Sequence, residues 1–190
     1  MSTVILFITE AHIKEVSIID ENIDAKLIMN AIREAQDINI HPILGTGLYN
    51  ELKTQVNAGT VTALNVTLLD DYIKWALIYW TLYQGVDIFT YKIRNKGIYK
   101  QSSENSTSLD LEETRRLMDA FRNKAEWYSE RITKYLLENQ TSYPLYINPG
   151  NTVDTIHPKR NNYTTDWYLG GYKKKDNDWN PYENTSDCDC

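Results

Sequence analysis

Cysteine is nearly absent from this chain of 190 residues, and long apolar runs are missing altogether. The only cysteines, Cys188 and Cys190, stand at the C-terminal end, where they cannot cross-link a core. A reducing compartment such as the cytoplasm therefore fits best. The most apolar stretch, residues 75–83, contains Thr81 and is far shorter than the about 20 apolar residues of a membrane span. We expect a protein with no membrane partner.

A secretory leader and an excess of positive charge are also lacking. The apolar segment at residues 4–8 has no basic region before it and no small-residue cleavage site after it, so we expect a strand or buried arm there. The chain has 26 acidic and 20 basic residues, a formal charge of −6. This balance disfavours sequence-independent binding along a phosphate backbone, although it leaves room for a local basic patch.

Signatures of catalytic, metal and cofactor sites are not found. His12, His41 and His157 are far apart and have no cysteine or carboxylate at ligand spacing, so we expect no metal and no other cofactor. Gly45 and Gly47 precede no lysine in phosphate-loop register, which favours a small-residue contact within a helix. Patterns of serine, threonine or cysteine nucleophiles are absent as well. We therefore expect no enzyme.

Helix signals, by contrast, are abundant in the first 140 residues. Thr9 is a plausible cap for a short helix over residues 10–16, and Asp24 occupies the cap position of a longer amphipathic helix. The second helix should stop near Asn39, because His41 precedes a proline and is biased away from the α region.

Three further helices follow. Pro42 suits the first turn of one that ends at the breaker before Gly59. Residues 67–93 are apolar around most of a helical circumference, which indicates the centre of a bundle or a subunit interface. Asp110, with Glu113 three residues later, predicts a capping box that opens the last long helix.

Two segments fall outside this helical pattern. Residues 95–108 are polar and predict a long loop or a hairpin. Beyond Gln140, prolines and glycines exclude helices, yet aromatics are too many for a solvated tail, so this arm must dock on its own bundle or on a neighbouring subunit. The expected fold is all-α: a bundle of about four to five helices over residues 1–140, with an extended arm over residues 141–190.

The candidate interface residues lie in the aromatic helix, the long loop and the arm. They are Tyr72, Trp75, Tyr79 and Tyr83, then Lys96, Ile98 and Tyr99, and finally Tyr146, Tyr163, Trp167, Tyr168, Tyr172, Trp179 and Tyr182.

Two small basic clusters in the arm offer an alternative function. Lys159 with Arg160, and the run at residues 173–175, stand among aromatics, as in surfaces that bind single-stranded nucleic acid. Six acidic residues nearby favour contact with protein instead. A nucleic-acid-binding packaging or regulatory protein remains the alternative, and an enzyme comes third.

One run is similar to the hallmark segment of a known family. Residues 35–52, AQDINIHPILGTGLYNEL, resemble head-to-tail connector proteins of tailed bacteriophages of Bacteroidetes hosts, including the crAss-like phages. Three further stretches add to the resemblance, which covers most of residues 8–150. They are Ile8-Thr9-Glu10, Asn95-Lys96-Gly97-Ile98 with the loop after it, and residues 125–128 with Tyr135-Leu136.

The resemblance implies a structural role in the virion. Such connectors are α-helical adaptors that assemble, typically as twelve copies, below the portal ring and extend the channel through which DNA enters and leaves the capsid. The implied partners are copies of the chain itself, the portal protein, other neck or tail rings, and DNA that passes without sequence-specific binding. The implied location is the virion neck, after synthesis in the cytoplasm of the bacterial host. The family brings no catalytic residues to carry over.

Overall fold

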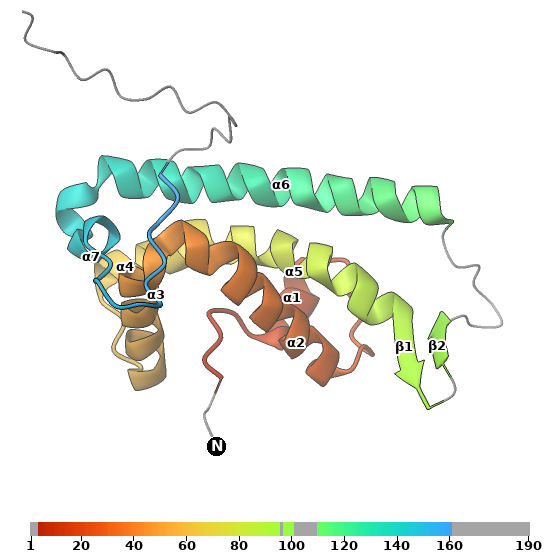
Figure 1. Cartoon of the computed structure of the whole chain (residues 1–190). Helices are drawn as coiled ribbons and strands as arrows, with labels where there is room; N and C mark the ends of the chain where they lie inside the picture. The colour runs from red at the N-terminus through yellow and green to blue at the C-terminus, as the bar shows by residue number, and fades with distance from the viewer. Residues whose placement is uncertain (1–3, 96, 101–109, 161–190) are drawn as a thin grey trace, which may run out of the picture.

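The computed structural model describes residues 4–95, 97–100 and 110–160. It is an all-α bundle, as predicted, with one small β-hairpin between its two longest helical stretches (Figure 1). The first half contains α1 (Glu10–Val16), α2 (Ala25–Ala35), the π-helical segment η1 (Gln36–Ile40), α3 (His41–Ala58) and α4 (Ala63–Thr67). The second half contains the π-helical segment η2 (Leu68–Ile73), α5 (Lys74–Thr90), β1 (Tyr91–Arg94), β2 (Gly97–Lys100), α6 (Leu111–Glu138), the 3-10 turn η3 (Gln140–Ser142) and α7 (Pro144–Ile147).

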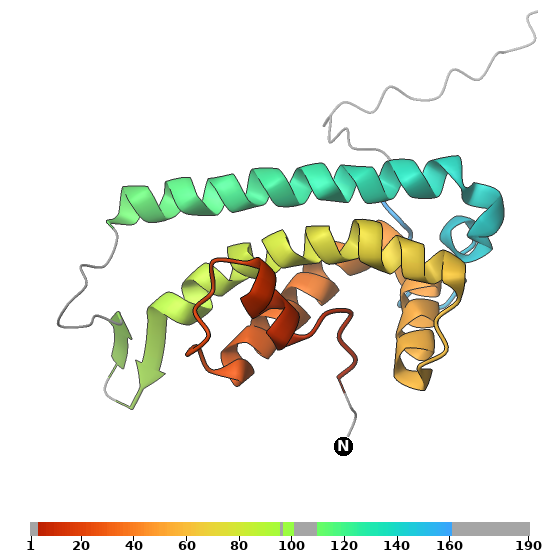
Figure 2. The same ribbon diagram turned by 180° about the vertical axis from the view of Figure 1, so that it is seen from behind.

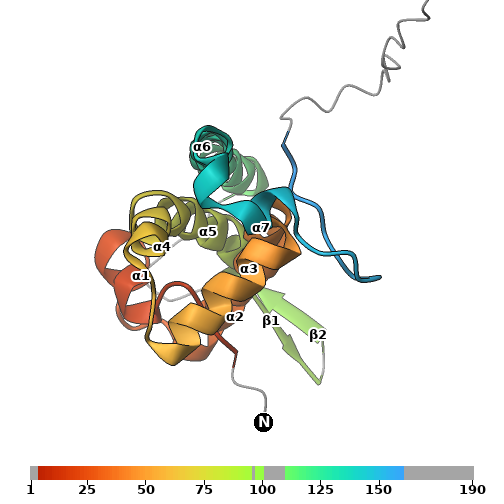
Figure 3. The same ribbon diagram turned by 90° about the vertical axis from the view of Figure 1, so that its left-hand side faces the viewer.

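Helix α5 forms the centre of the bundle. It packs against α2 on one side and α6 on another, an arrangement that is clearest along the bundle axis in Figure 3. Ala76 and Leu77 are completely buried within it, and Ile78 is 2 % exposed. The apolar circumference of this helix predicted either the centre of a bundle or a subunit interface. The helix occupies the centre of the bundle.

The predicted caps are present. The Thr9 side chain accepts a hydrogen bond from the backbone N–H of His12, and Asp24 accepts one from Lys26. Asp110 and Glu113 form a full capping box at the start of α6. These contacts satisfy backbone donors that have no partner inside a helix, which explains why the three starts could be located from the sequence.

The end predicted for the second helix is wrong. The helix does not stop near Asn39 but continues through η1 into α3, and the break comes at Gly45, whose φ of 75° and ψ of 157° are not helical. In η1 the His41 N–H bonds to the Gln36 carbonyl, five residues back. A wider π turn accommodates Pro42, which lacks an N–H and would clash with the carbonyl four residues earlier in a regular helix.

The aromatic helix also has different bounds from those predicted. Helicity begins at Ala63, four residues before the predicted start, with Thr62 as its cap, and ends at Thr90 instead of residue 93. Tyr91 is extended and begins β1, which pairs antiparallel with β2 in the register Tyr91 to Lys100. A hairpin therefore accounts for the described part of the predicted loop, while residues 101–109 lie outside the described residues.

Residues 141–160 complete the bundle instead of leaving it. The prediction that prolines and glycines exclude helices beyond Gln140 is wrong for α7, where Pro144 stands in the first turn, a position that tolerates proline. Tyr143 and Tyr146 are 2 % and 0 % exposed and belong to the same core as the long helices. The chain then folds back across α3, where the Thr46 N–H bonds to the Ile156 carbonyl and the Lys159 N–H bonds to the Pro42 carbonyl. This part of the predicted arm docks on its own bundle, and residues 161–190 lie outside the described residues.

Candidate protein-interaction surfaces

Stacked aromatic rings line one side of the seam that α6 forms with η2 and α5; α5 and α6 run alongside each other in Figure 2. The Tyr72 ring stacks on Tyr135 at a centroid distance of 4.2 Å. Trp75 and Tyr79 both stack on Tyr128, at 6.1 and 5.5 Å. Ring pairs at these distances stabilise the helix pair and hold the rings in fixed orientations.

Two cations and a further tryptophan extend this cluster onto the surface. Arg131 Cζ lies 5.2 Å from the Tyr72 ring centroid and 5.3 Å from that of Trp127, and Lys124 Nζ lies 5.4 Å from that of Tyr79. Trp75 is 40 % exposed and Trp127 is 56 % exposed. We call this surface the aromatic flank. It consists of Tyr72, Trp75, Tyr79, Lys124, Trp127, Tyr128, Arg131 and Tyr135.

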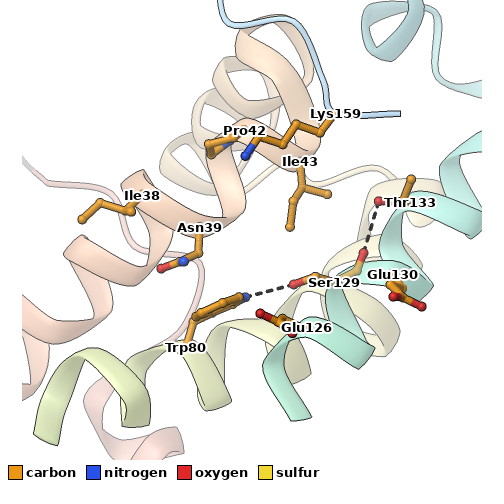
Figure 4. Close-up of a pocket in the computed structure, with 10 residues that line it drawn as sticks. All are labelled: Ile38, Asn39, Pro42, Ile43, Trp80, Glu126, Ser129, Glu130, Thr133 and Lys159. Atoms are coloured by element: carbon orange, nitrogen blue, oxygen red, sulfur yellow. Dashed lines mark hydrogen bonds between the residues drawn. The ribbon is translucent and has the colours of Figure 1, made fainter. Parts of the chain in front are cut away.

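A cleft of about 420 Å³ lies where η1 and the start of α3 approach α5 and α6 (Figure 4). Trp80 lines it and donates a hydrogen bond from Nε1 to Ser129 Oγ at 2.9 Å. Glu126 and Glu130 stand on the α6 side, and Lys159 lies across from them beside Pro42. The cleft therefore has a mixed lining, in which apolar side chains stand beside two carboxylates, a lysine and neutral polar groups.

The predicted interface residues have different places in the structure. Tyr72, Trp75 and Tyr79 meet on the aromatic flank, whereas Tyr83 is half-buried with its ring edge-on to Trp80 at 5.8 Å. Tyr146 is 0 % exposed, so its ring has no surface for a partner.

The remaining predicted interface residues belong to the hairpin or to undescribed parts of the chain. Ile98 and Tyr99 belong to β2, paired with Ile93 and Lys92. Lys96, Tyr163, Trp167, Tyr168, Tyr172, Trp179 and Tyr182 lie outside the described residues.

Trp127 and Arg131 were missed as interface candidates. Both stand in α6 outside its buried stripe. The same helix carries exposed ion pairs, in which Arg116 contacts Glu112 at 2.7 Å and Lys134 contacts Glu130 at 3.8 Å. The spacing of Trp127 and Arg131, four residues apart, is the signal that could have placed them on one face.

Gln36 in η1 holds the N-terminal segment on the bundle. Its Oε1 accepts the Phe7 N–H at 2.8 Å, and its Nε2 donates to the Ile5 carbonyl at 3.0 Å and to the Tyr49 hydroxyl at 3.1 Å. The Tyr49 hydroxyl in turn donates to Asp37 Oδ1 at 2.6 Å. Burial raises the pKa of the Tyr49 phenol, and the hydrogen bond to Asp37 raises it further, so the ring remains a neutral donor.

His41 packs flat on Tyr49, with ring centroids 4.2 Å apart, and its Nε2 lies 3.1 Å from Thr46 Oγ1. Burial lowers the pKa of this imidazole, and the charge of Lys53 lowers it further, whereas Asp37 acts in the opposite direction. The folded chain therefore favours neutral His41 more strongly than the unfolded chain does.

This shift predicts a loss of stability in mild acid. The contribution of His41 is fully present above its unfolded pKa of about 6.5 and is lost as the pH falls through the lower folded pKa, because the unfolded state then binds the extra proton. Urea unfolding measured from about pH 7.5 down to about pH 5 should give a falling free energy of unfolding. His41→Gln should flatten this dependence, whereas His157→Gln, at an exposed position, should leave it unchanged. An unchanged slope in His41→Gln would contradict the assignment.

Gly45 and Gly47 lie directly under residues 145–160, which fold back across α3 and which we call the returning segment. A Cβ atom at Gly45 would lie 2.7 Å from Pro158 Cδ, and one at Gly47 would lie 2.8 Å from Pro149 Cα. The small-residue contact predicted here is therefore real, but its partner is the returning segment. Arg160 fastens the end of that segment by donating to the Tyr146 and Ile147 carbonyls at 3.3 and 2.8 Å.

Two searches of the described residues gave negative results. Within residues 4–95, 97–100 and 110–160, no three histidine, cysteine or acidic side chains gather in a way that could hold a metal ion. In the same part of the chain, no helix combines the length and apolar character needed to cross a membrane.

Residues 40–156, more than half of the chain, match the model of a family described as a family of unknown function (DUF6712). The chain belongs to this family. No curated protein and no solved structure matches the chain. The DUF6712 segment contains the whole aromatic flank and most of the cleft lining. Its two ends also meet in space, since Ile156 is hydrogen-bonded to Thr46 by both its N–H and its carbonyl.

Proposed function

We propose that this DUF6712 protein is a structural subunit of a tailed-phage neck. In this proposal, copies of the chain form a ring that joins the portal to the tail and extends the DNA channel. The ring retains the packaged genome and lets it pass during ejection without sequence-specific contact. The net charge of −6 suits a conduit along which DNA must slide without sticking.

The aromatic flank is the observation that carries this proposal. Interfaces between proteins are enriched in tryptophan, tyrosine and arginine, and a few such residues supply most of the binding energy. Trp75, Trp127 and Arg131 present this composition on one surface. Trp75 is held by stacking on Tyr128, Trp127 by an edge-on contact with the same ring, and Arg131 by cation–π contact with Trp127. A surface of this composition supports the proposal that the protein acts by assembling with other proteins.

The segment that resembles phage connectors supports the proposal in a second way. Residues 35–52 build η1 and most of α3, which hold the Gln36 hydrogen bonds, the glycines under the returning segment, and one wall of the cleft. The resemblance therefore falls on residues that organise the bundle and not on an isolated surface loop.

Mass measurement of assemblies tests the proposal. The purified chain, alone and mixed with the portal protein of the same phage, should give a complex that contains the portal and several copies of the chain. The portal alone and the chain alone are the controls. A chain that stays monomeric and never joins a portal-containing assembly would contradict the proposal, whereas a free monomer without portal would not, because the ring can require the portal as its template.

Nucleic-acid binding through the basic clusters is the competing function. Arg160 argues against it, because its guanidinium contacts two backbone carbonyls and the Tyr146 ring of its own chain. The lysines at residues 173–175 lie outside the described residues. An electrophoretic shift at moderate salt that is lost when these lysines are neutralised would favour the competing function.

A further inference from the structure

Basic residues are concentrated in the β-hairpin. The ten residues from 91 to 100 include four basic residues and no acidic one. The basic residues are Lys92, Arg94, Lys96 and Lys100. Since the whole chain has a formal charge of −6 and the hairpin contributes +4, the other residues together carry −10. The chain therefore places a positive hairpin on an otherwise acidic protein.

The hairpin projects from the bundle. Helix α5 ends at Thr90, and Tyr91, with a φ of −114° and a ψ of 142°, leads the chain directly into β1. Figures 1 and 3 show the two strands extending away from the helices at this end of α5. Among the described residues each strand pairs only with the other, so the two strands form a ribbon of their own.

The register of the hairpin distributes its basic positions over both faces of the ribbon. Tyr91 pairs with Lys100, and Lys92 pairs with Tyr99. Successive residues of a strand belong to opposite faces of a sheet, and directly paired residues belong to the same face. Positions 92 and 94 therefore share one face, and position 100 belongs to the other.

The acidic residues nearest the hairpin neutralise little of this charge. Helix α6 begins at the same end of the bundle (Figure 1), but its first acidic residues are engaged within that helix. Asp110 and Glu113 form the capping box, and Glu112 pairs with Arg116 at 2.7 Å. Asp87, in the last turn of α5, is exposed and offsets one of the positive charges. The hairpin therefore suits an anionic partner.

We infer that the hairpin contacts the phosphate backbone of double-stranded DNA, with Lys92, Arg94 and Lys100 as the contact residues. This inference rests on the proposed neck ring, whose channel holds DNA, and names the part of each copy that touches it. The major groove of B-form DNA admits a two-stranded β-ribbon. Basic positions on both faces of the ribbon allow contact with the phosphates on both sides of the groove.

DNA fits the hairpin better than a protein does. A second copy would bring a hairpin of the same charge, and lysines on an open strand edge oppose pairing with another edge. An acidic protein surface has the right charge, but DNA also has a groove of the right width for the ribbon. Contacts with phosphates carry no sequence information and allow a protein to slide along DNA. Such a contact is therefore compatible with passage of the genome through the ring.

DNA binding by the full-length chain tests this contact. Fluorescence anisotropy with two short duplexes of unrelated sequence, between about 50 and 200 mM salt, should show binding that is equal for both and weakens as salt rises. Lys92→Gln with Arg94→Gln and Lys100→Gln should weaken binding to both duplexes. The slope of the logarithm of the binding constant against the logarithm of the salt concentration should become shallower by about one for each lost phosphate contact, hence by about three.

Two further variants are the controls. Lys26→Gln with Arg122→Gln and Lys134→Gln removes the same charge from exposed helix positions and should leave the slope unchanged.

A charge-preserving exchange in the hairpin itself, Lys92→Arg with Arg94→Lys and Lys100→Arg, should bind like the wild type. If the triple glutamine variant loses its helical circular dichroism, Lys100→Gln alone replaces it, with an expected change in slope of about one.

Several results would overturn the inference. They are wild-type chain that binds neither duplex at about 50 mM salt, an unchanged slope in the hairpin variant, and an equal loss in the helix variant. Binding that is lost only when residues 173–175 are neutralised would also overturn it and would favour the competing function.

The failure of this contact can be told apart from failure of the proposed function. Chains that join the portal but bind no DNA through the hairpin would remove the contact and leave the neck ring in place. Chains that bind DNA through the hairpin but never join a portal would contradict the neck ring and leave the contact.

Discussion

Gly47→Ala should lower the free energy of unfolding by about 1–3 kcal/mol, the usual cost of forcing extra atoms into a closely packed site. A Cβ atom at this position would lie 2.8 Å from Pro149 Cα, 2.9 Å from the Pro149 carbonyl oxygen and 3.1 Å from the Leu145 carbonyl oxygen. All three atoms belong to backbone and cannot move aside as a flexible side chain could. The returning segment must therefore lift from α3, and urea unfolding measures the cost.

Whether Gly47→Ala lowers or raises the free energy of unfolding shows whether the returning segment packs on this glycine. In an open helix, alanine is more favourable than glycine by about 1 kcal/mol, so a site without the overlying segment would be stabilised by the same change. Amide exchange should locate the damage, with faster exchange at Thr46 and Lys159, whose N–H groups bond across the contact. Gly59→Ala is the control, because that glycine has a φ of 67° but no atom within 4 Å, so only local strain is expected. Stability equal to or above the wild type in Gly47→Ala would contradict the packing described here.

Gln36→Met should also destabilise the chain strongly, by about 1–3 kcal/mol. Methionine keeps much of the size of the side chain, which is only 2 % exposed, but it removes hydrogen bonds to Phe7, Ile5 and Tyr49. The Phe7 N–H is then left buried without its acceptor, and a buried unpaired donor costs more than an ordinary hydrogen bond contributes. Denaturant unfolding measures the loss.

A matched control separates this effect from the loss of any glutamine. Within the part of the chain that the structure describes, Gln84 makes one side-chain hydrogen bond, from Nε2 to Asn39 at 3.2 Å in a partly buried site, so Gln84→Met should cost clearly less. Exchange at the Phe7 amide should rise in Gln36→Met and stay slow in Gln84→Met. Equal losses in the two variants would show that Gln36 has no special part in holding the N-terminal segment.

The features of the fold that depend on local chemistry were predictable from sequence. Thr9, Asp24 and Asp110 cap helices because their side chains accept hydrogen bonds a few residues along, and neighbouring residues decide such contacts. The buried stripe of α6, with Phe121, Ala125, Ile132 and Leu136, follows from helical spacing alone.

Features set by tertiary structure were missed. Pro42 is a normal breaker, but a π turn before it let the helix continue, and packing around Gln36 and Tyr49 stabilises that turn. The hairpin was predicted as one of two possibilities, but only from residue 95 onward. The strand β1 begins earlier, at Tyr91, inside the predicted helix. The run Tyr91-Lys92-Ile93-Arg94 alternates apolar and basic residues, a strand pattern that the strong helical period before it obscured.

The candidate site was only partly accessible from sequence. Tyr72, Trp75 and Tyr79 were recognisable because aromatics are dense in that segment, and the structure brings them together. The cleft was not recognisable, since its walls come from four separate parts of the chain that only folding brings together. Tyr146 was predicted to contact a partner, because it is an aromatic residue in a proline-rich segment. Its ring instead lies in the core of its own chain.

Electron cryomicroscopy of virion necks from the phage that encodes this chain tests the central claim most directly. The account predicts a ring immediately below the portal, around the DNA channel, whose subunit density fits the bundle with α6 running along α5 and the segment after α7 folded across α3. Necks in which every ring between portal and tail is fully explained by other chains, with no density that fits this bundle, would contradict the account.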